Sequence, residues 1–292
     1  MPKGEYRRML DCSAIRRFSA DIRISTIRSL ERAGFGHIGG SMSIADVLAV
    51  LYGGVMRIDP AHPDWDGRDY FVLSKGHCGP ALYAALALKG YFPMDWLDTV
   101  NQPGTHLPSH CDRQKTPGID MTTGSLGQGI SAAAGIALGL KLQKKDNFVF
   151  CIVGDGELQE GQVWEAAASA AHQKLDRLIV FVDENKRQLD GYLCDVCNPY
   201  DPVEKFRSFG WSAERVCGWD CEAIERAIRA AEAEGGAPHA IVLETEKGIG
   251  CSFAEKEPFN HYMVITKEMA DEAVAEIERR LLAGTYPRGE RV

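Results

Sequence analysis

The sequence predicts an α/β fold built on a doubly wound, mostly parallel sheet with helices on both faces. Two observations support this prediction: short, continuously apolar runs recur along the chain, and helical patterns lie between them. A strand that is apolar on both of its sides is typical of a parallel sheet covered by helices on both faces. No linker or composition shift divides the 292 residues. We therefore expect one domain, 1–292, with an N-terminal helical segment.

The expected elements follow in chain order. Apolar residues at helical spacing predict a first helix over 5–33, which Gly34 and Gly36 end. The predicted strands are YFVLS at 70–74, FVFCIV at 148–153, LIVFV at 178–182 and AIVLE at 240–244. The further predicted helices span about 79–89, 127–145, 160–173, 203–209, 220–234 and 266–282. Strands and helices thus alternate, as strand-helix-strand units require.

Charge and hydropathy narrow the classes of partner. The net charge of -8 argues against nucleic acid and anionic membranes, because such partners need clustered Lys and Arg. No apolar run approaches the roughly 18 to 20 residues of a membrane span, and the start, MPKGEYRRML, lacks the apolar core of a signal peptide. We expect a cytoplasmic protein that acts on small molecules, with no nucleic acid and no membrane partner.

The cysteines argue against a disulfide framework. Their number, nine, is odd, and they are scattered through the chain, so reduced thiols are expected. Cys194-x-x-Cys197 followed by Cys217-x-x-x-Cys221 comes near a four-thiolate zinc pattern, although the second pair is spaced by three residues rather than two. Scattered structural thiols are the alternative to zinc.

Polar residues follow two successive predicted strands. Gly154-Asp155-Gly156 follows the strand at 148–153, and Asn185 follows the next one. The carboxyl ends of parallel strands form the ligand-binding edge of such a sheet. A carboxylate and a side-chain amide suit Mg2+ or Ca2+, and Mg2+ usually bridges to ligand phosphates, so a diphosphate cofactor is expected. A plain turn is the alternative for Gly-Asp-Gly.

These residues resemble a known motif. GDG followed about thirty residues later by Asn resembles the motif of thiamine diphosphate enzymes, and nearly the whole chain resembles the N-terminal half of transketolase. The matching segments are GHIGGSMSIADVLAVLY (36–52), SKGH (74–77), TPGIDMTTGSLGQGI (116–130), GDGELQEGQVWEAA (154–167), DENKRQLDG (183–191) and TEKGIGCSF (245–253). The resemblance implies the diphosphate-binding domain of the thiamine diphosphate-binding fold, with thiamine diphosphate and Mg2+ (or Ca2+) as cofactors.

The resemblance also implies where the diphosphate and its metal ion bind. Asp155, Asn185 and the backbone carbonyl of Arg187 would hold the ion. Gly154 and Gly156 would lie against the diphosphate. Two lysines match family lysines near the diphosphate, where flexible point charges suit the task, and they are Lys75 and Lys247. Solvated surface lysines are the alternative for these two.

Four histidines match family histidines around the diphosphate, the thiazolium and the substrate hydroxyls. They are His37, His77, His110 and His261. The chain departs from the family's usual pattern at Tyr262, where glycine is common, and at Ser109 and Cys111, where glycine and proline are common. Surface or structural histidines are the alternative reading.

Further matches concern the aminopyrimidine and a neighbouring chain. Gly124, through its carbonyl, and Leu126, by packing, match the segment that contacts the aminopyrimidine; a close-packed helix start is the alternative. Glu160 and Glu165 match carboxylates that face another chain and link paired active sites. Solvent-facing helix charges are the alternative for these glutamates.

The resemblance implies transfer of a two-carbon ketol unit from a ketose phosphate donor to an aldose acceptor, a reaction that the cofactor supplies and the protein orients. The glutamate that activates the cofactor belongs to a pyrimidine-binding domain that lies beyond this chain. The chain is therefore either a fragment or the diphosphate-binding subunit of a split transketolase, and its terminal helix favours the split enzyme. The expected partner is a C-terminal transketolase subunit on a separate chain, in an α2β2 assembly.

Two alternatives to this function remain at the level of sequence. The α subunit of a 2-oxo acid dehydrogenase also has GDG and a partner chain, but SKGH and the run at 116–130 fit transketolase better. A non-catalytic cofactor-binding scaffold could keep the fold, but the retained Asp155, Asn185 and histidines argue against it. The substrate stays open between a pentose phosphate, a sulfosugar and another ketose phosphate.

Overall fold

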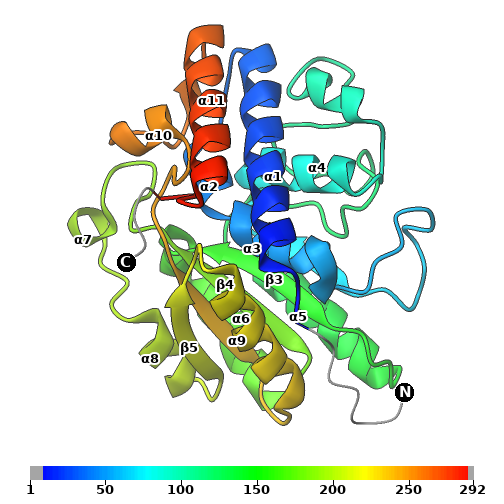
Figure 1. Ribbon diagram of the computed structural model, residues 1–292. Helices are drawn as coiled ribbons and strands as arrows, with labels where there is room; N and C mark the ends of the chain where they lie inside the picture. The colour runs from blue at the N-terminus through cyan, green and yellow to red at the C-terminus, as the bar shows by residue number, and fades with distance from the viewer. Residues whose placement is uncertain (1–8, 289–292) are drawn as a thin grey trace.

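A five-stranded sheet lies at the centre of the computed structural model, which describes residues 9–288 (Figure 1). The strands are β2 (Tyr70–Leu73), β3 (Val149–Gly154), β4 (Leu178–Glu184), β5 (Ser212–Cys217) and β6 (His239–Glu244). Their order across the sheet is β2-β3-β4-β6-β5, and all neighbours are parallel. The predicted α/β class with a parallel sheet is confirmed.

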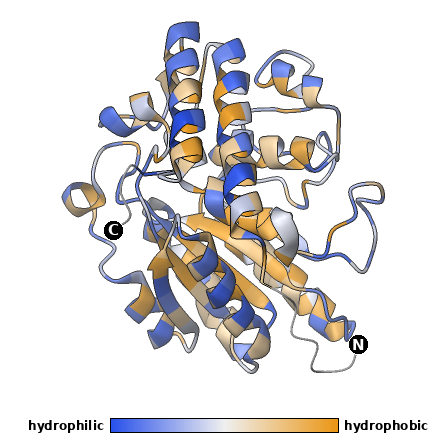
Figure 2. Ribbon diagram, in the orientation of Figure 1, coloured by the Kyte–Doolittle hydropathy of each residue, from blue (hydrophilic) through white to orange (hydrophobic). Residues whose placement is uncertain are grey.

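Side chains alternate across the sheet and form a core on each face, as the two-residue period of a strand requires. Phe150 and Ile152 of β3 belong to one core, and Val149, Cys151 and Val153 belong to the other. The central strands are therefore apolar on both sides, and they appear in the hydrophobic colour in Figure 2. This double burial explains the continuous apolar runs of the sequence.

Helices supply the other half of each core. The first core includes residues of α1 (Cys12–Ala33), α3 (Ala45–Val50), α4 (Gly79–Leu88), α9 (Cys221–Ala233) and α11 (Lys267–Ala283). The second includes residues of α5 (Gln128–Leu142), α6 (Gly161–His172) and α8 (Pro202–Ser208). Both faces are thus covered, as the doubly wound prediction requires.

The first helix begins later than predicted. Asp11 caps α1 by accepting hydrogen bonds from the backbone N–H groups of Ser13 and Ala14, which fixes the start at Cys12. Residues 5–8 of the predicted helix lie outside the described residues. Gly34, at φ +82°, ends α1 as predicted.

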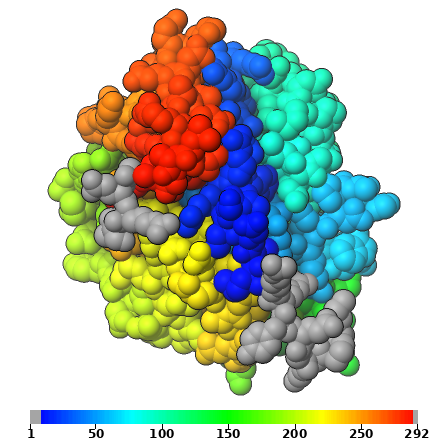
Figure 3. Space-filling view, in the orientation of Figure 1, coloured from blue at the N-terminus to red at the C-terminus, as the bar shows by residue number. Residues whose placement is uncertain are grey.

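The helix α1 lies beside α11 on the surface, and Figure 3 shows the two, in blue and orange to red, next to each other. Two ion pairs join them: Arg17 contacts Glu278 at 3.0 Å, and Arg28 contacts Asp271 at 2.7 Å. Both pairs are partly exposed, so they add little stability compared with the apolar contacts beneath them.

Several elements were not predicted. The buried segment 39–55 forms α2 (Gly39–Ser43), α3 and a π-helical turn, Leu51–Val55. Other unpredicted elements are the helices α7 (Leu193–Val196) and α10 (Ser252–Lys256), the edge strand β5, and the antiparallel pair β1 (Phe35–Gly36) and β7 (Met263–Val264). Short 3-10 turns span Gly76–Cys78, Met94–Thr99 and Gly156–Gln159.

The cysteines do not form the zinc site that their spacing left open. All nine are free thiols, and Cys194 and Cys197 are exposed whereas Cys221 is buried. Within residues 9–288, no group of three or more His, Cys, Asp or Glu side chains is arranged to hold a metal ion. Over the same residues, no helix is both long and apolar enough to cross a membrane.

Candidate active site at the carboxyl edge of the sheet

A cavity of about 340 Å³ opens where β2, β3 and β4 end. Its lining includes every residue that the sequence assigns to the cofactor, the metal or catalysis: His37, Lys75, His77, His110, Gly124, Leu126, Gly154, Asp155, Gly156, Glu160, Asn185, Arg187, Lys247 and His261. Glu165, farther along α6, is exposed and is not part of the lining. The chain folds so that residues from loops far apart in sequence meet in one place.

The register of the sheet explains why the two polar motifs meet. Gly154 pairs with Asp183 across β3 and β4, so the Gly-Asp-Gly turn and the segment that contains Asn185 leave the sheet side by side. Asp155 is only 2% exposed. Its two carboxylate oxygens accept hydrogen bonds from the backbone N–H of Gly156 at 2.8 Å and of Lys186 at 2.6 Å.

The charge of Asp155 is poorly compensated in this structure. Burial, together with the neighbouring Asp183 carboxylate, raises the pKa of Asp155 to about 7. A divalent cation beside Asp155 would favour its ionised form and reverse that shift. The environment of Asp155 therefore fits a carboxylate that ligates a metal ion.

Asn185 and Arg187 offer oxygens at the same end of the cavity. The side-chain amide of Asn185 donates to Asp183 Oδ2 at 2.7 Å, and this bond leaves Asn185 Oδ1 as an acceptor, which takes the Arg187 N–H at 3.2 Å. The carbonyl oxygen of Arg187 accepts a hydrogen bond from the Lys247 ammonium at 3.3 Å. A carboxylate, an amide oxygen and a carbonyl oxygen form a hard donor set that suits Mg2+ or Ca2+.

The two predicted lysines have different environments. Lys75 is buried, and its ammonium donates to Asp183 and, at 3.2 Å, to the Gly40 carbonyl. Burial alone would lower the pKa of Lys75, but the adjacent carboxylate outweighs it and raises the pKa. Lys247 instead contacts two backbone carbonyls and the His261 ring, and burial, followed by repulsion from Lys75, lowers its pKa to about 8. Lys247 therefore has no carboxylate partner among the described residues and can pair with an anion in the cavity.

The four predicted histidines surround one point. The His37 ring lies 5.4 Å from His77, 5.6 Å from His110 and 5.3 Å from His261, measured between ring centroids. Tyr262, the departure from the family pattern, packs edge-on against His37 at 4.9 Å. The rings thus form one cluster in the lining of the cavity.

All four imidazoles are held neutral near pH 7. Burial is the main cause, and it lowers the pKa of His37 to about 4 and that of His261 to about 3, with further lowering by Lys247. Burial also lowers the pKa values of His77 and His110. A neutral imidazole has one donor and one acceptor nitrogen, so the cluster can bind hydroxyl groups and move protons.

Two acidic residues that hold parts of the site together were not predicted from the sequence. Asp183 fixes both Lys75 and Asn185, and Glu157 follows directly after the Gly-Asp-Gly turn. Their partners are mostly distant in sequence, so no spacing identifies them. The only available signal was position: each is an acidic residue near the carboxyl end of a predicted strand.

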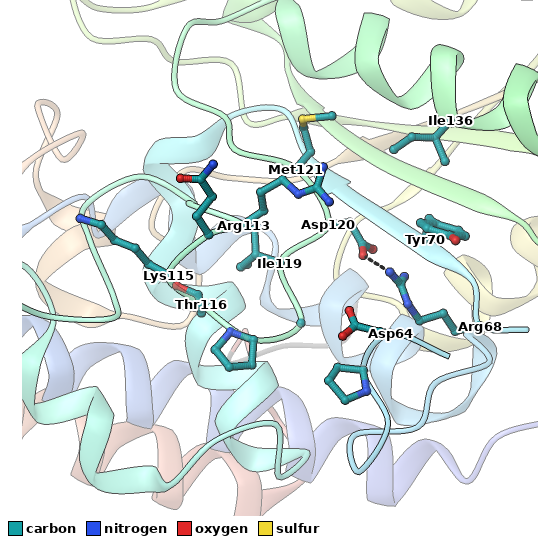
Figure 4. A pocket seen from close by; sticks show the side chains of 14 residues that line it. Asp64, Arg68, Tyr70, Arg113, Lys115, Thr116, Ile119, Asp120, Met121 and Ile136 are labelled. Atoms are coloured by element: carbon teal, nitrogen blue, oxygen red, sulfur yellow. Dashed lines mark ion pairs between the residues drawn. The ribbon is translucent and has the colours of Figure 1, made fainter. Parts of the chain in front are cut away.

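A second and larger cavity, of about 460 Å³, contains none of the predicted site residues. Figure 4 shows one of its two arginines, Arg68, turned toward Asp120, with which it pairs at 2.7 Å beside the Tyr70 ring. Asp120 also accepts the backbone N–H of Phe71 at 2.8 Å. The residues that the resemblance assigns to the cofactor line the smaller cavity instead.

Comparison with known proteins identifies the family. A family profile described as "Transketolase, thiamine diphosphate binding domain" matches residues 15–281. The chain belongs to the transketolase family. It is 53% identical, over 88% of its length and 94% of the relative, to the 6-deoxy-6-sulfo-D-fructose transketolase subunit SqwG of Clostridium sp. (strain MSTE9). It is 37% identical, over 86% of its length and 89% of the relative, to an apulose-4-phosphate transketolase subunit of Phocaeicola vulgatus.

Solved structures agree with this assignment. The transketolase from Leishmania mexicana superposes with a TM-score of 0.85 at 31% identity, and the match covers 97% of this chain but 43% of that chain. The relatives that this chain matches over nearly their whole length are named as subunits. The chain is thus a thiamine diphosphate-binding, ketol-transferring subunit of the transketolase type, in a split enzyme. The dehydrogenase and scaffold alternatives are not favoured.

Proposed function

We propose that this chain is the diphosphate- and metal-binding subunit of a two-chain transketolase whose ketose donor is a 6-deoxy-6-sulfoketose and whose acceptor is an aldose. The observation that supports this donor is the 53% identity to a sulfofructose transketolase subunit, compared with 37% to an apulose-4-phosphate transketolase subunit of similar coverage. The assembly of the predicted cofactor, metal and catalytic residues around one cavity supports the reaction class.

Asp155, Asn185 and the Arg187 carbonyl would hold Mg2+ or Ca2+, because they are the oxygen donors at the diphosphate end of the cavity. Gly156 lies close to the neighbouring loop: a Cβ added there would meet the Gln188 side chain at 3.1 Å. Glycine at this position therefore lets the turn pack against that loop. Lys247 would add a positive charge beside the diphosphate.

Thiamine diphosphate, when bound, supplies the nucleophilic carbon and the electron sink for ketol transfer. The protein's task is to bind, orient and protonate. The neutral histidines, His37, His77, His110 and His261, would hold the sugar hydroxyls and carry protons to and from them. Gly124 and Leu126 would contact the aminopyrimidine.

The partner is proposed to be a C-terminal transketolase subunit with the pyrimidine-binding domain, in an α2β2 assembly. Glu160 and Glu165 are exposed in this chain, as carboxylates at an interface between chains would be before assembly. Closed twofold symmetry is the usual arrangement of such pairs. We place residues 1–292 in the cytoplasm as one diphosphate-binding domain, which the nine free cysteines support.

The test is reconstitution with the cognate C-terminal subunit. We expect no ketol transfer by this chain alone, transfer by the mixture, and a higher kcat/KM for 6-deoxy-6-sulfofructose than for fructose 6-phosphate or apulose 4-phosphate. Ketol transfer by the purified chain alone would contradict the two-chain proposal. Equal or better use of the phosphorylated donors would contradict the sulfoketose proposal and leave the reaction class intact.

A further inference from the structure

The carboxylate of Glu157 lies buried among three loops of the active site. Its residue is only 2% exposed, although it borders the cofactor cavity. A carboxylate in such a position is costly unless hydrogen bonds and nearby charge compensate its burial. The hydrogen-bond donors around the Glu157 carboxylate therefore indicate its role.

Among the described residues, three groups donate hydrogen bonds to the Glu157 side chain. Oε1 accepts the hydroxyl of Ser74 and, at 2.8 Å, the backbone N–H of Gly127. Oε2 accepts the backbone N–H of Gly154 at 3.0 Å. The two oxygens thus bind three separate segments of the chain. The Ser74 partner is 83 residues away in sequence and the Gly127 partner is 30 residues away.

Each donor stands next to residues of the cofactor cavity. Ser74 precedes Lys75 in the loop after β2, Gly127 follows Leu126 at the start of α5, and Gly154, the last residue of β3, precedes Asp155. The three loops therefore share one anchor. A shift of the Glu157 carboxylate would move the proposed metal ligand and two other parts of the cavity together.

Ser74 and its surroundings leave little room for adjustment. A Cβ added at Gly129 of α5 would lie 2.5 Å from the Ser74 Cα, so the helix packs directly on the loop after β2. Gly127, at φ +84°, is the N-cap residue of α5, and glycine has no side chain that could cap the helix. Glu157 Oε1 accepts the N–H of this N-cap residue from outside the helix, as the glutamate of a capping box does.

We propose that Glu157 is a positioning residue that fixes the geometry of the cofactor cavity by binding these three loops with one carboxylate. The inference rests on the proposed function, because it assumes that thiamine diphosphate occupies this cavity. Glutamine cannot replace the carboxylate: its NH2 group would face the Gly127 N–H in one orientation and the Gly154 N–H in the other. One backbone donor would lose its acceptor in either case.

The experiment compares Glu157→Gln with wild type in the complex with the C-terminal subunit. Calorimetry measures the Kd for thiamine diphosphate in the presence of Mg2+, and the same preparations are assayed for kcat at saturating cofactor and for the Tm of the cofactor-free complex. We expect a Kd about 10- to 100-fold higher, the usual effect of losing a residue that orients metal ligands. Saturating cofactor should restore most of the kcat, because Glu157 is not proposed to contact the reacting atoms.

Two controls separate positioning from folding. Glu214→Gln makes the same chemical change at an exposed position on β5 and should leave the Kd unchanged. Ser74→Ala removes a single donor and keeps the carboxylate, so it should raise the Kd by a smaller factor, about threefold to tenfold. If Glu157→Gln does not fold, the Kd of Ser74→Ala decides the question.

A wild-type Kd for Glu157→Gln would overturn the proposal, as would an unchanged Kd for Ser74→Ala when Glu157→Gln fails to fold. A weaker Kd that is fully explained by a smaller folded fraction, with a correspondingly lower Tm, would also overturn it. Failure of the wild-type complex to bind thiamine diphosphate would instead overturn the cofactor assignment on which the inference rests.

Discussion

Replacing Lys75 by methionine should destabilise the protein strongly, although the change removes one charge and keeps most of the side-chain volume. Lys75 is 2% exposed, and its ion-pair partner, Asp183, is 0% exposed. Without the ammonium, Asp183 Oδ2 keeps only the Ser43 hydroxyl and the Asn185 amide, each at 2.7 Å, and Oδ1 has no hydrogen-bond partner among the described residues. The variant would therefore leave a buried anion compensated only by neutral donors.

Breaking a buried ion pair by removing one partner costs about 3 to 5 kcal/mol. We expect a value near the lower figure, because two hydrogen bonds to Asp183 remain and the carboxyl group can take up a proton. The effect should reach function as well, since Asp183 orients Asn185. Urea denaturation, followed by circular dichroism, measures the change in the free energy of unfolding.

The matched control is Lys145→Met. Lys145 pairs with Asp66 at 3.1 Å, but Asp66 is 85% exposed, so this variant should cost less than about 1 kcal/mol. A double variant, Lys75→Met with Asp183→Asn, removes both buried charges and should recover at least half of the loss. A loss below about 1 kcal/mol for Lys75→Met, or a double variant no more stable than the single one, would refute this reasoning.

Three further predictions concern the cavity. Asp155→Ala should abolish Mg2+-dependent binding of thiamine diphosphate, because the diphosphate loses its charged metal ligand; an unchanged calorimetric Kd would rule out the ligand assignment. His37→Ala and His77→Ala should lower kcat/KM for ketol transfer about 100-fold or more while changing the Tm little; equal losses of activity and folded fraction would indicate structural roles. The pKa of His37 is lowered to about 4, so the folded protein binds fewer protons than the unfolded chain below about pH 6.5 and stability falls as the pH drops toward 4. The full pKa shift would lower the free energy of unfolding by about 2 kcal/mol between pH 7 and pH 5. Because the His37 ring is partly exposed, solvent screening reduces this loss to about 1 kcal/mol. His37→Asn should remove this part of the pH dependence in urea titrations at the two pH values, and an unaltered dependence would contradict the lowered pKa.

The fold could be predicted where burial is uniform along a strand. The central strands β3, β4 and β6 contact apolar side chains on both faces, and their predicted starts or ends lie within two residues of the observed ones. The edge strand β5 was missed because Glu214 and Arg215 are exposed and only one side of the strand pairs, with β6. Burial of nearly the whole segment 39–55 likewise leaves no polar face, and hence no helical period to detect.

The site could be predicted in part by topology and in part only by resemblance. Asp155 and Asn185 followed from the rule that ligands bind where parallel strands end. The histidines have no common spacing, and only the family resemblance pointed to them. Glu157 and Asp183 could not be predicted, because Ser74 is 83 residues from Glu157 and Lys75 is 108 residues from Asp183. Hydrogen bonds between distant loops leave no periodic trace in a sequence.

The two ends of the cavity differ in burial. This difference indicates what a second chain would add to the site. At the proposed diphosphate end, Asp155, Asn185 and Lys247 are buried and hydrogen-bonded within this chain. At the proposed aminopyrimidine end, Leu126 is only partly buried and Glu160 is exposed. Exposed groups at that end contact water, which weakens charge stabilisation there compared with the buried end. A chain that surrounds the proposed anionic end with buried groups, yet leaves the proposed aminopyrimidine end partly exposed, would gain a drier site when a partner covers that end. On this argument the proposed partner would do more than supply a glutamate: it would also exclude water from the polar contacts at that end.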